Sequence, residues 1–208
     1  MTRDQIKLKI LTSKLIAIIR LDDPSNLYPI ACAIADGGIT SIEITMTTPN
    51  ALIEIKKLSA RPDILVGVGS VVDSDIAVAA VEAGAQYVVT PVTMKEIIDI
   101  THGMGKPIIS GALTPTEIVQ AYDWGADVIK LFPAGQFGIS YLKALKAPLP
   151  HIPIIPTGGI NVDNAQMWLK AGAVALGIGG GLINQKIVAD QNYKAITEMA
   201  KALVLAVK

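Results

Sequence analysis

The sequence is poor in cysteine, histidine and aromatic residues, and each shortage excludes a class of site. The one cysteine, Cys32, has no partner for an internal disulfide, which is typical of a cytoplasmic protein. It lies in a helical pattern over residues 27–36 and is expected to be a small core residue. The two histidines, His102 and His151, are expected at the surface. No cluster of His, Asp and Glu has the spacing of metal ligands, so we predict no metal site.

Net charge and long apolar runs are missing as well. Eighteen Lys and Arg balance eighteen Asp and Glu, and aromatic residues make up 4% of the chain. This composition offers no basic stripe with stacking residues, which argues against nucleic-acid binding. No apolar run reaches the roughly 18 residues of a membrane helix, and residues 1–10 lack the apolar centre of a signal peptide. We expect neither nucleic acid nor membrane as a partner.

Short apolar blocks, by contrast, are abundant, and 51% of the residues are hydrophobic. They recur roughly every 20–25 residues, each followed by an amphipathic stretch, which is the spacing of successive βα units. Near-continuous Val, Ile and Leu are typical of parallel strands covered on both faces. Strands are predicted at residues 15–20, 41–45, 65–68, 87–90, 107–110, 127–131, 152–156 and 173–178.

Helical patterns lie between these strands. Gly84, Gly125 and Gly172 follow three of them, at positions where glycine accepts the left-handed conformation of a helix C-cap. An additional N-terminal helix is predicted over residues 2–14. The predicted helices between strands include 73–83, 95–103, 116–124 and 162–171, with N-caps at Asp73, Thr93, Thr114 and Asn161.

Eight strands alternating with helices fit a closed barrel or a doubly wound open sheet. An open sheet usually carries a glycine-rich turn after its first strand. Here the first strand is followed by Leu21-Asp22-Asp23-Pro24, which cannot cradle a pyrophosphate. The sequence therefore predicts an α/β fold, a (β/α)8 TIM barrel. Residues 1–208 would form a single domain, with the N-terminal helix covering the barrel floor.

A TIM barrel carries its active site at the C-terminal ends of the strands. Arg20, Glu43 and Lys130 fall near those ends within otherwise apolar strands. An unpaired charge in a core is costly, so such groups are normally paired, neutralised or functional. A structural ion-pair cluster is one explanation, and a catalytic site is the other.

Lys130 points to a specific chemistry. Strand alternation puts it on the same face as Val128. If that face is the inside of the barrel, desolvation favours the neutral amine. A neutral amine attacks a ketone to form an imine, and the protonated imine is an electron sink that permits carbon–carbon cleavage. This is class I aldolase chemistry. Glu43, inward like Thr45, is predicted to move the protons, although an ionised Glu43 favours the charged amine instead.

Two glycine-rich turns indicate a phosphate site. Thr157-Gly158-Gly159 follows the seventh strand, and Gly177 to Gly181, which includes Gly179 and Gly180, follows the eighth. TIM barrels commonly hold a phosphate on the amides of these two loops. Alternatively, Gly177 and Gly179 serve only the close packing of the last strand.

In combination, these segments resemble the 2-keto-3-deoxy-6-phosphogluconate (KDPG) and 4-hydroxy-2-oxoglutarate (KHG) aldolases. The resemblance covers nearly the whole chain, from the first strand to the C-terminal helix. Together the matching motifs are far more specific than any one of them. They are residues 16–20, 38–45, 67–71, 90–91, 129–134 and 156–160.

The resemblance implies a homotrimer in which Lys130 forms the Schiff base and Glu43 is the general acid/base. No metal or separate cofactor is implied beyond the covalent imine. The substrate would be cleaved reversibly to pyruvate and glyceraldehyde 3-phosphate, or, for KHG, to pyruvate and glyoxylate. Substrate-binding positions would be Arg20, Ser70 and Pro91 at the pyruvyl end, Phe132 beside the lysine, and Gly158 and Gly159 with the glycines after the eighth strand at the phosphate.

Two positions depart from the family pattern. Thr47 stands where well-known members have an arginine, and Gly180 where they have a phosphate-loop serine. Losing a cation and a hydroxyl weakens anion recognition. The galactonate epimer and unphosphorylated 2-keto acids therefore stay open as substrates, and residues 137–146 look like the galactonate-type members. A phosphate-binding isomerase or epimerase and a non-catalytic metabolite-binding barrel are the alternatives from other classes.

Overall fold

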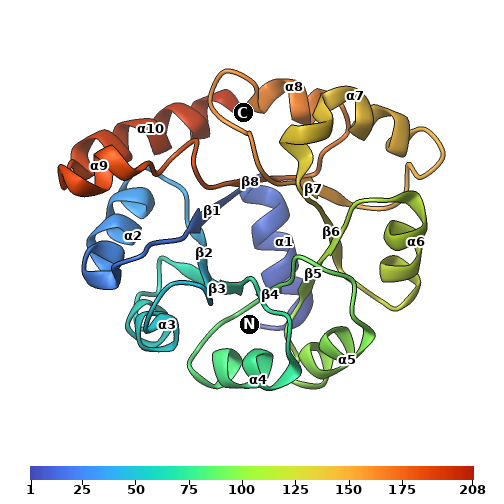
Figure 1. The fold of residues 1–208 in the computed structure, drawn as a ribbon, viewed down its shortest axis with the longest axis horizontal. Coiled ribbons are helices and arrows are strands. Elements are labelled where there is room, and N and C mark those ends of the chain that lie inside the picture. Colours follow the sequence, from blue (N-terminus) through green and yellow to red (C-terminus); the bar gives the residue numbers. More distant parts are fainter.

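The strands form a ring at the centre of the molecule, with helices outside it (Figure 1). This computed structural model describes residues 1–208, except for the side chain of residue 185. Neighbouring strands are parallel and follow chain order, and β1 also pairs with β8. The strands are β1 (Leu15–Ile19), β2 (Ser41–Thr45), β3 (Leu65–Gly69), β4 (Val88–Val89), β5 (Ile108–Ala112), β6 (Val128–Leu131), β7 (Ile154–Pro156) and β8 (Leu176–Ile178).

The ring closes between β7 and β8. A bridge pairs Thr157 with Gly177, and the amide of Val174 donates to the carbonyl of Ile154 over 3.0 Å. The predicted TIM barrel is therefore confirmed, and all eight predicted strands are present. Their ends differ from the prediction by up to three residues, because hydrogen bonding rather than apolar character decides where a strand stops.

Helices cover the outside of the ring (Figure 1). Within α7, Gly138 has a non-helical backbone (φ 77°, ψ 175°) that kinks the helix. The helices are α1 (Arg3–Ser13), α2 (Leu27–Asp36), α3 (Ala51–Ser59), α4 (Ser74–Glu82), α5 (Lys95–Gly103), α6 (Pro115–Asp123), α7 (Ala134–Lys146), α8 (Ala165–Lys170), α9 (Gln185–Ala189) and α10 (Tyr193–Ala206).

Two of the four predicted N-caps are confirmed. Asp73 accepts from backbone amides at the start of α4, and Thr114 forms a capping box at the start of α6. Thr93 and Asn161 are wrong as caps. The Thr93 hydroxyl donates to a carbonyl of β5, and the Asn161 side chain accepts from amides in the turn before α8. Both side chains bind a nearer partner, as short polar side chains often do.

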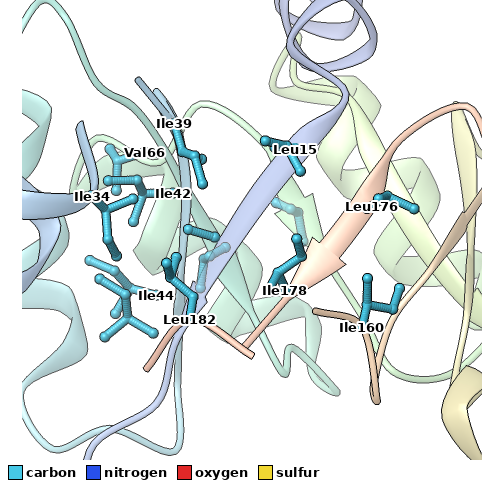
Figure 2. Packing of buried hydrophobic residues seen from close by; sticks show 14 of the residues in the cluster. Leu15, Ile34, Ile39, Ile42, Ile44, Val66, Ile160, Leu176, Ile178 and Leu182 are labelled. Carbon is cyan, nitrogen blue, oxygen red and sulfur yellow. The ribbon is translucent and has the colours of Figure 1, made fainter. Parts of the chain in front are cut away.

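Strand alternation divides the core into two layers. Outward-facing residues pack against the helices, and Figure 2 shows Leu15 of β1, Ile42 of β2 and Leu176 of β8 in this outer layer. Inward-facing residues fill the ring, where Ile6 and Ile10 of α1 join a separate cluster with residues of the strands. Figure 1 shows α1 across the centre of the ring. The predicted N-terminal helix therefore covers the barrel floor.

The floor is fastened by one buried carboxylate, Asp127, which is 5% exposed. Arg3 Nε of α1 donates to both of its oxygens, over 3.0 and 3.1 Å. His102 Nε2 lies 3.1 Å from Oδ2, and the amide of Ile108 donates to the same oxygen over 3.0 Å. His102 was expected at the surface, and this is wrong: it is half-buried because Asp127 binds it. His151 is exposed, as expected.

Cys32 was expected to be a core residue. It is only half-buried. Arg61 Nη1 lies 3.2 Å from its sulfur, so one side of the thiol meets a polar neighbour.

None of the described helices combines the length and the apolar character that crossing a bilayer requires.

Candidate active site

Two oppositely charged side chains meet inside the barrel near its mouth. Lys130 comes from β6 and Glu43 from β2, and Lys130 Nζ lies 3.6 Å from Glu43 Oε1. Both residues are buried, with 6% and 2% of their surface exposed. Their predicted inward direction is confirmed. The separation is too long for a hydrogen bond, and Glu43 Oε1 has no hydrogen-bond partner among the described groups.

Glycines of β3 make room for this pair. A side chain at Gly69 would overlap the Glu43 carboxylate, and one at Gly67 would overlap the ring of Tyr87. The sequence Leu65-Val66-Gly67-Val68-Gly69 therefore alternates valines that pack outward with glycines that leave space inside the ring. Polar side chains occupy that space.

Arg20 was expected within the barrel beside Glu43 and Lys130, and the structure corrects this. It follows the last residue of β1 and is exposed at the mouth. Arg20 Nη2 donates to Ser70 Oγ over 3.2 Å. The interior ion pair therefore has two members, and the guanidinium stands above it, bound to a hydroxyl.

A cavity of about 510 Å³ opens at this mouth. Phe132 connects it with the ion pair, because its ring centroid lies 5.6 Å from Lys130 Nζ. Arg20 is the one ionisable side chain among the described residues that line the cavity. Of the predicted site residues, the lining includes Arg20, Phe132, Thr157, Gly158, Gly159, Gly179 and Gly180.

The glycine-rich turns form the far wall of the cavity. Gly158 and Gly159 have φ angles of 98° and 71°, in the left-handed region that other residues rarely adopt. The Asn164 side chain holds the turn by donating to the Gly159 carbonyl over 2.9 Å. This wall offers backbone groups and one nearby guanidinium, which together suit an anion.

Three predicted substrate-binding residues are not among those that line the cavity: Ser70, which accepts from Arg20, and Thr47 and Pro91. Thr47 is exposed, and its hydroxyl lies 3.0 Å from the Thr45 hydroxyl beyond β2. Pro91 is half-buried beyond β4, with its backbone against the position where a side chain at Gly111 would stand. Thr47 and Pro91 each follow the C-terminal end of a strand, β2 and β4 respectively.

Tyr87, which precedes β4, was missed as a site residue. It is fully buried, and its hydroxyl has no hydrogen-bond partner among the described groups. Burial, and after it the charge of Glu43, raises the pKa of Tyr87 well above its ordinary value. The available signal was an aromatic hydroxyl at the start of an otherwise aliphatic strand block. Ile18 and Ile183, which line the cavity, gave no such signal.

No group of three or more His, Cys, Asp and Glu side chains in the described part of the chain is arranged to hold a metal ion.

Residues 6–199 match the family model described as KDPG and KHG aldolase. The chain is 35% identical to the 2-dehydro-3-deoxy-phosphogluconate aldolase of Pseudomonas aeruginosa, over 89% of this chain and 85% of that protein. It is 33% identical to the 2-dehydro-3-deoxy-6-phosphogalactonate aldolase of Escherichia coli, over 92% and 93% of the two chains.

Among solved structures, the chain is similar to the KDPG aldolase of Legionella pneumophila, which was captured with pyruvate as a covalent carbinolamine intermediate. The TM-score is 0.88 at 29% identity, and the match covers 96% of this chain and 98% of that one.

Proposed function

The chain belongs to the KDPG and KHG aldolase family of class I aldolases, and on that premise we propose that Lys130 is its Schiff-base lysine. The proposed reaction is the reversible cleavage of a 2-keto-3-deoxy sugar acid to pyruvate and an aldehyde. One observation carries it: a buried amine stands 3.6 Å from a buried carboxylate, beside a cavity at the barrel mouth.

In this proposal the Lys130 amine attacks the C2 carbonyl of the substrate and forms a carbinolamine. Glu43 donates a proton to the departing hydroxyl, and water leaves as the iminium forms. The iminium accepts the electrons of the C3–C4 bond while Glu43, directly or through water, removes the proton of the C4 hydroxyl. The aldehyde departs, and Glu43 passes the proton that it took to C3 of the remaining enamine. Hydrolysis of the imine then releases pyruvate and the free amine.

The mouth residues divide between the two ends of the substrate. Arg20, supported by Ser70, binds the C1 carboxylate, and Pro91 borders the same end. Phe132 covers the carbons next to the imine. Thr157 and the glycines 158, 159, 179 and 180 receive a distal phosphate on their backbone amides.

KDPG is the first candidate substrate, because the cavity wall suits an anion and the matched relatives include KDPG aldolases. The phosphogalactonate epimer is the second, supported by the 33% identical Escherichia coli relative. With Thr47 and Gly180, the chain lacks the cation and the hydroxyl that well-known members carry at these two positions, so cleavage of KHG to pyruvate and glyoxylate is also included. We further propose that residues 1–208 act as a single domain within a homotrimer, which light scattering would test.

The substrate is tested by coupling pyruvate release to lactate dehydrogenase. A panel would pair phosphorylated with unphosphorylated 2-keto-3-deoxy acids, gluconate-type with galactonate-type, and include KHG. We expect the highest kcat/KM for a phosphorylated member. Equal kcat/KM with and without phosphate would refute the phosphate site. Turnover of a sugar phosphate without pyruvate release, surviving Lys130→Arg, would instead indicate an isomerase or epimerase.

A further inference from the structure

The barrel interior holds a second polar group beside the ion pair, the hydroxyl of Tyr87. Tyr87 is 0% exposed. Its hydroxyl and Glu43 Oε1 are both buried, and neither has a hydrogen-bond partner among the described protein groups. Leaving two buried polar atoms unpaired is costly, and folded proteins normally pair such atoms through protein or ordered water.

The two side chains occupy neighbouring inward positions along β3, and the charge of Glu43 acts on the Tyr87 hydroxyl. The distal ring atoms of Tyr87, next to its hydroxyl, occupy the space that a side chain at Gly67 would take. The Glu43 carboxylate occupies the corresponding space at Gly69. Inward positions two residues apart on a strand are separated by roughly 6.5 Å. One water molecule, with hydrogen bonds of about 2.8 Å on each side, spans groups roughly 5.5 Å apart. The spacing of the two positions is of the same order as the span of one bridging water.

We propose that Tyr87 is a positioning residue for Glu43, acting through one enclosed water that accepts from the tyrosine hydroxyl and donates to Glu43 Oε1. This inference rests on the proposed function, in which Glu43 moves the protons. Tyr87 remains a hydrogen-bond donor throughout the cycle, because burial and the Glu43 charge raise its pKa. The bridge holds the carboxylate in one orientation, facing Lys130. Without it, the carboxylate would rotate, and fewer approaches would lead to proton transfer.

The test is Tyr87→Phe, which removes the hydroxyl and keeps the ring that fills the space at Gly67. Two readouts on pyruvate separate the steps. Borohydride trapping reports imine formation on Lys130, and exchange of the methyl protons in deuterium oxide reports proton transfer by Glu43. We expect wild-type trapping at equilibrium, an unchanged KM for pyruvate, and an exchange kcat lowered by about tenfold, as for a lost hydrogen bond to a charged group.

Tyr193→Phe is the matched control. Its hydroxyl donates to Asn26 Oδ1 over 2.8 Å, away from the ion pair, and its loss should leave exchange at the wild-type rate. Wild-type exchange in Tyr87→Phe would overturn the inference, as would a parallel loss of trapping and exchange, which indicates a merely structural role. A wild-type protein that neither traps nor exchanges pyruvate would refute the proposed function itself, and that failure is visible without any variant.

Discussion

The barrel contains a buried carboxylate near each end, and the two differ in how completely they are bonded. At the floor, both oxygens of Asp127 accept hydrogen bonds, from Arg3 and from the amide of Ile108, with His102 also in contact. Near the mouth, Glu43 has a cation 3.6 Å away and an oxygen without a hydrogen-bond partner among the described groups. Burial is similar, at 5% and 2% exposure.

This difference fits a structural role for Asp127 and the proton-transfer role that we propose for Glu43. A carboxylate whose oxygens are fully bonded holds the elements around it in place, here α1 against the barrel. A carboxylate with an unbonded oxygen beside a buried amine can accept and return a proton. Saturation of hydrogen bonds therefore distinguishes the two ends, whereas burial and charge alone do not.

The largest expected effect is the loss of the amine at the mouth. Lys130→Ala should lower pyruvate release by about 10⁵-fold or more, because it removes the covalent nucleophile. The circular dichroism spectrum should match the wild type, since the floor bonds are untouched. Substantial residual cleavage in the lactate dehydrogenase assay would mean that another group forms the imine.

Glu43→Gln tests the other half of the mouth pair. We expect kcat to fall by about 10²–10⁴-fold, the usual range for a general acid/base, with the fold retained. Gln keeps the shape that fits over Gly69 but cannot exchange a proton. Steady-state kinetics of pyruvate release measures the effect, and a decrease of less than tenfold would remove Glu43 from this role.

At the floor, the effect should be on stability rather than on rate. Asp127→Asn is expected to lower the free energy of unfolding by about 2–3 kcal/mol, because Arg3 and His102 lose a charged acceptor. The kcat should stay within about twofold of the wild type. Urea denaturation measures the change. Asp63→Asn is the matched control: this half-exposed carboxylate pairs with Arg61, and no measurable change is expected.

The smallest effect concerns Glu117, a well-bonded carboxylate in contact with solvent. Hydrogen bonds from the backbone amides of Thr114 and Leu113 hold the pKa of Glu117 below its ordinary 4.5. Its stabilisation is therefore present above pH 4.5 and is lost as the pH falls through the lowered pKa. Glu117→Ala should cost about 1 kcal/mol at pH 7. Urea midpoints of wild type and variant should converge as the pH falls through the lowered pKa; a gap that stays as large as at pH 7 would contradict this origin.

The sequence predicts the barrel because its signals are local and repeated. Alternation in β6 put Lys130 on the same face as Val128, and the structure shows that this is the inner face, as it does for Glu43 in β2. Arg20 was misplaced because it follows the strand, where alternation no longer restricts a side chain.

Contacts between distant residues could not be predicted in this way. His102 and Asp127 are 25 residues apart and meet only when α5 and β6 are both in place. The function of Gly67 and Gly69 as space for Tyr87 and Glu43 is similarly a property of the closed ring. The sequence pattern of one strand does not show which side chain of another strand will occupy the space beside its glycines.

The central claim is that the reactive amine is Lys130, and reduction with borohydride in the presence of pyruvate tests it most directly. Lys146 is the internal comparison: burial lowers its pKa, but its amine donates to the carbonyls of Pro150 and Ile152, before β7. Peptide mapping by mass spectrometry should find the reduced pyruvyl adduct on Lys130 and no adduct in Lys130→Ala. An unmodified protein, or an adduct on Lys146 instead, would contradict the account.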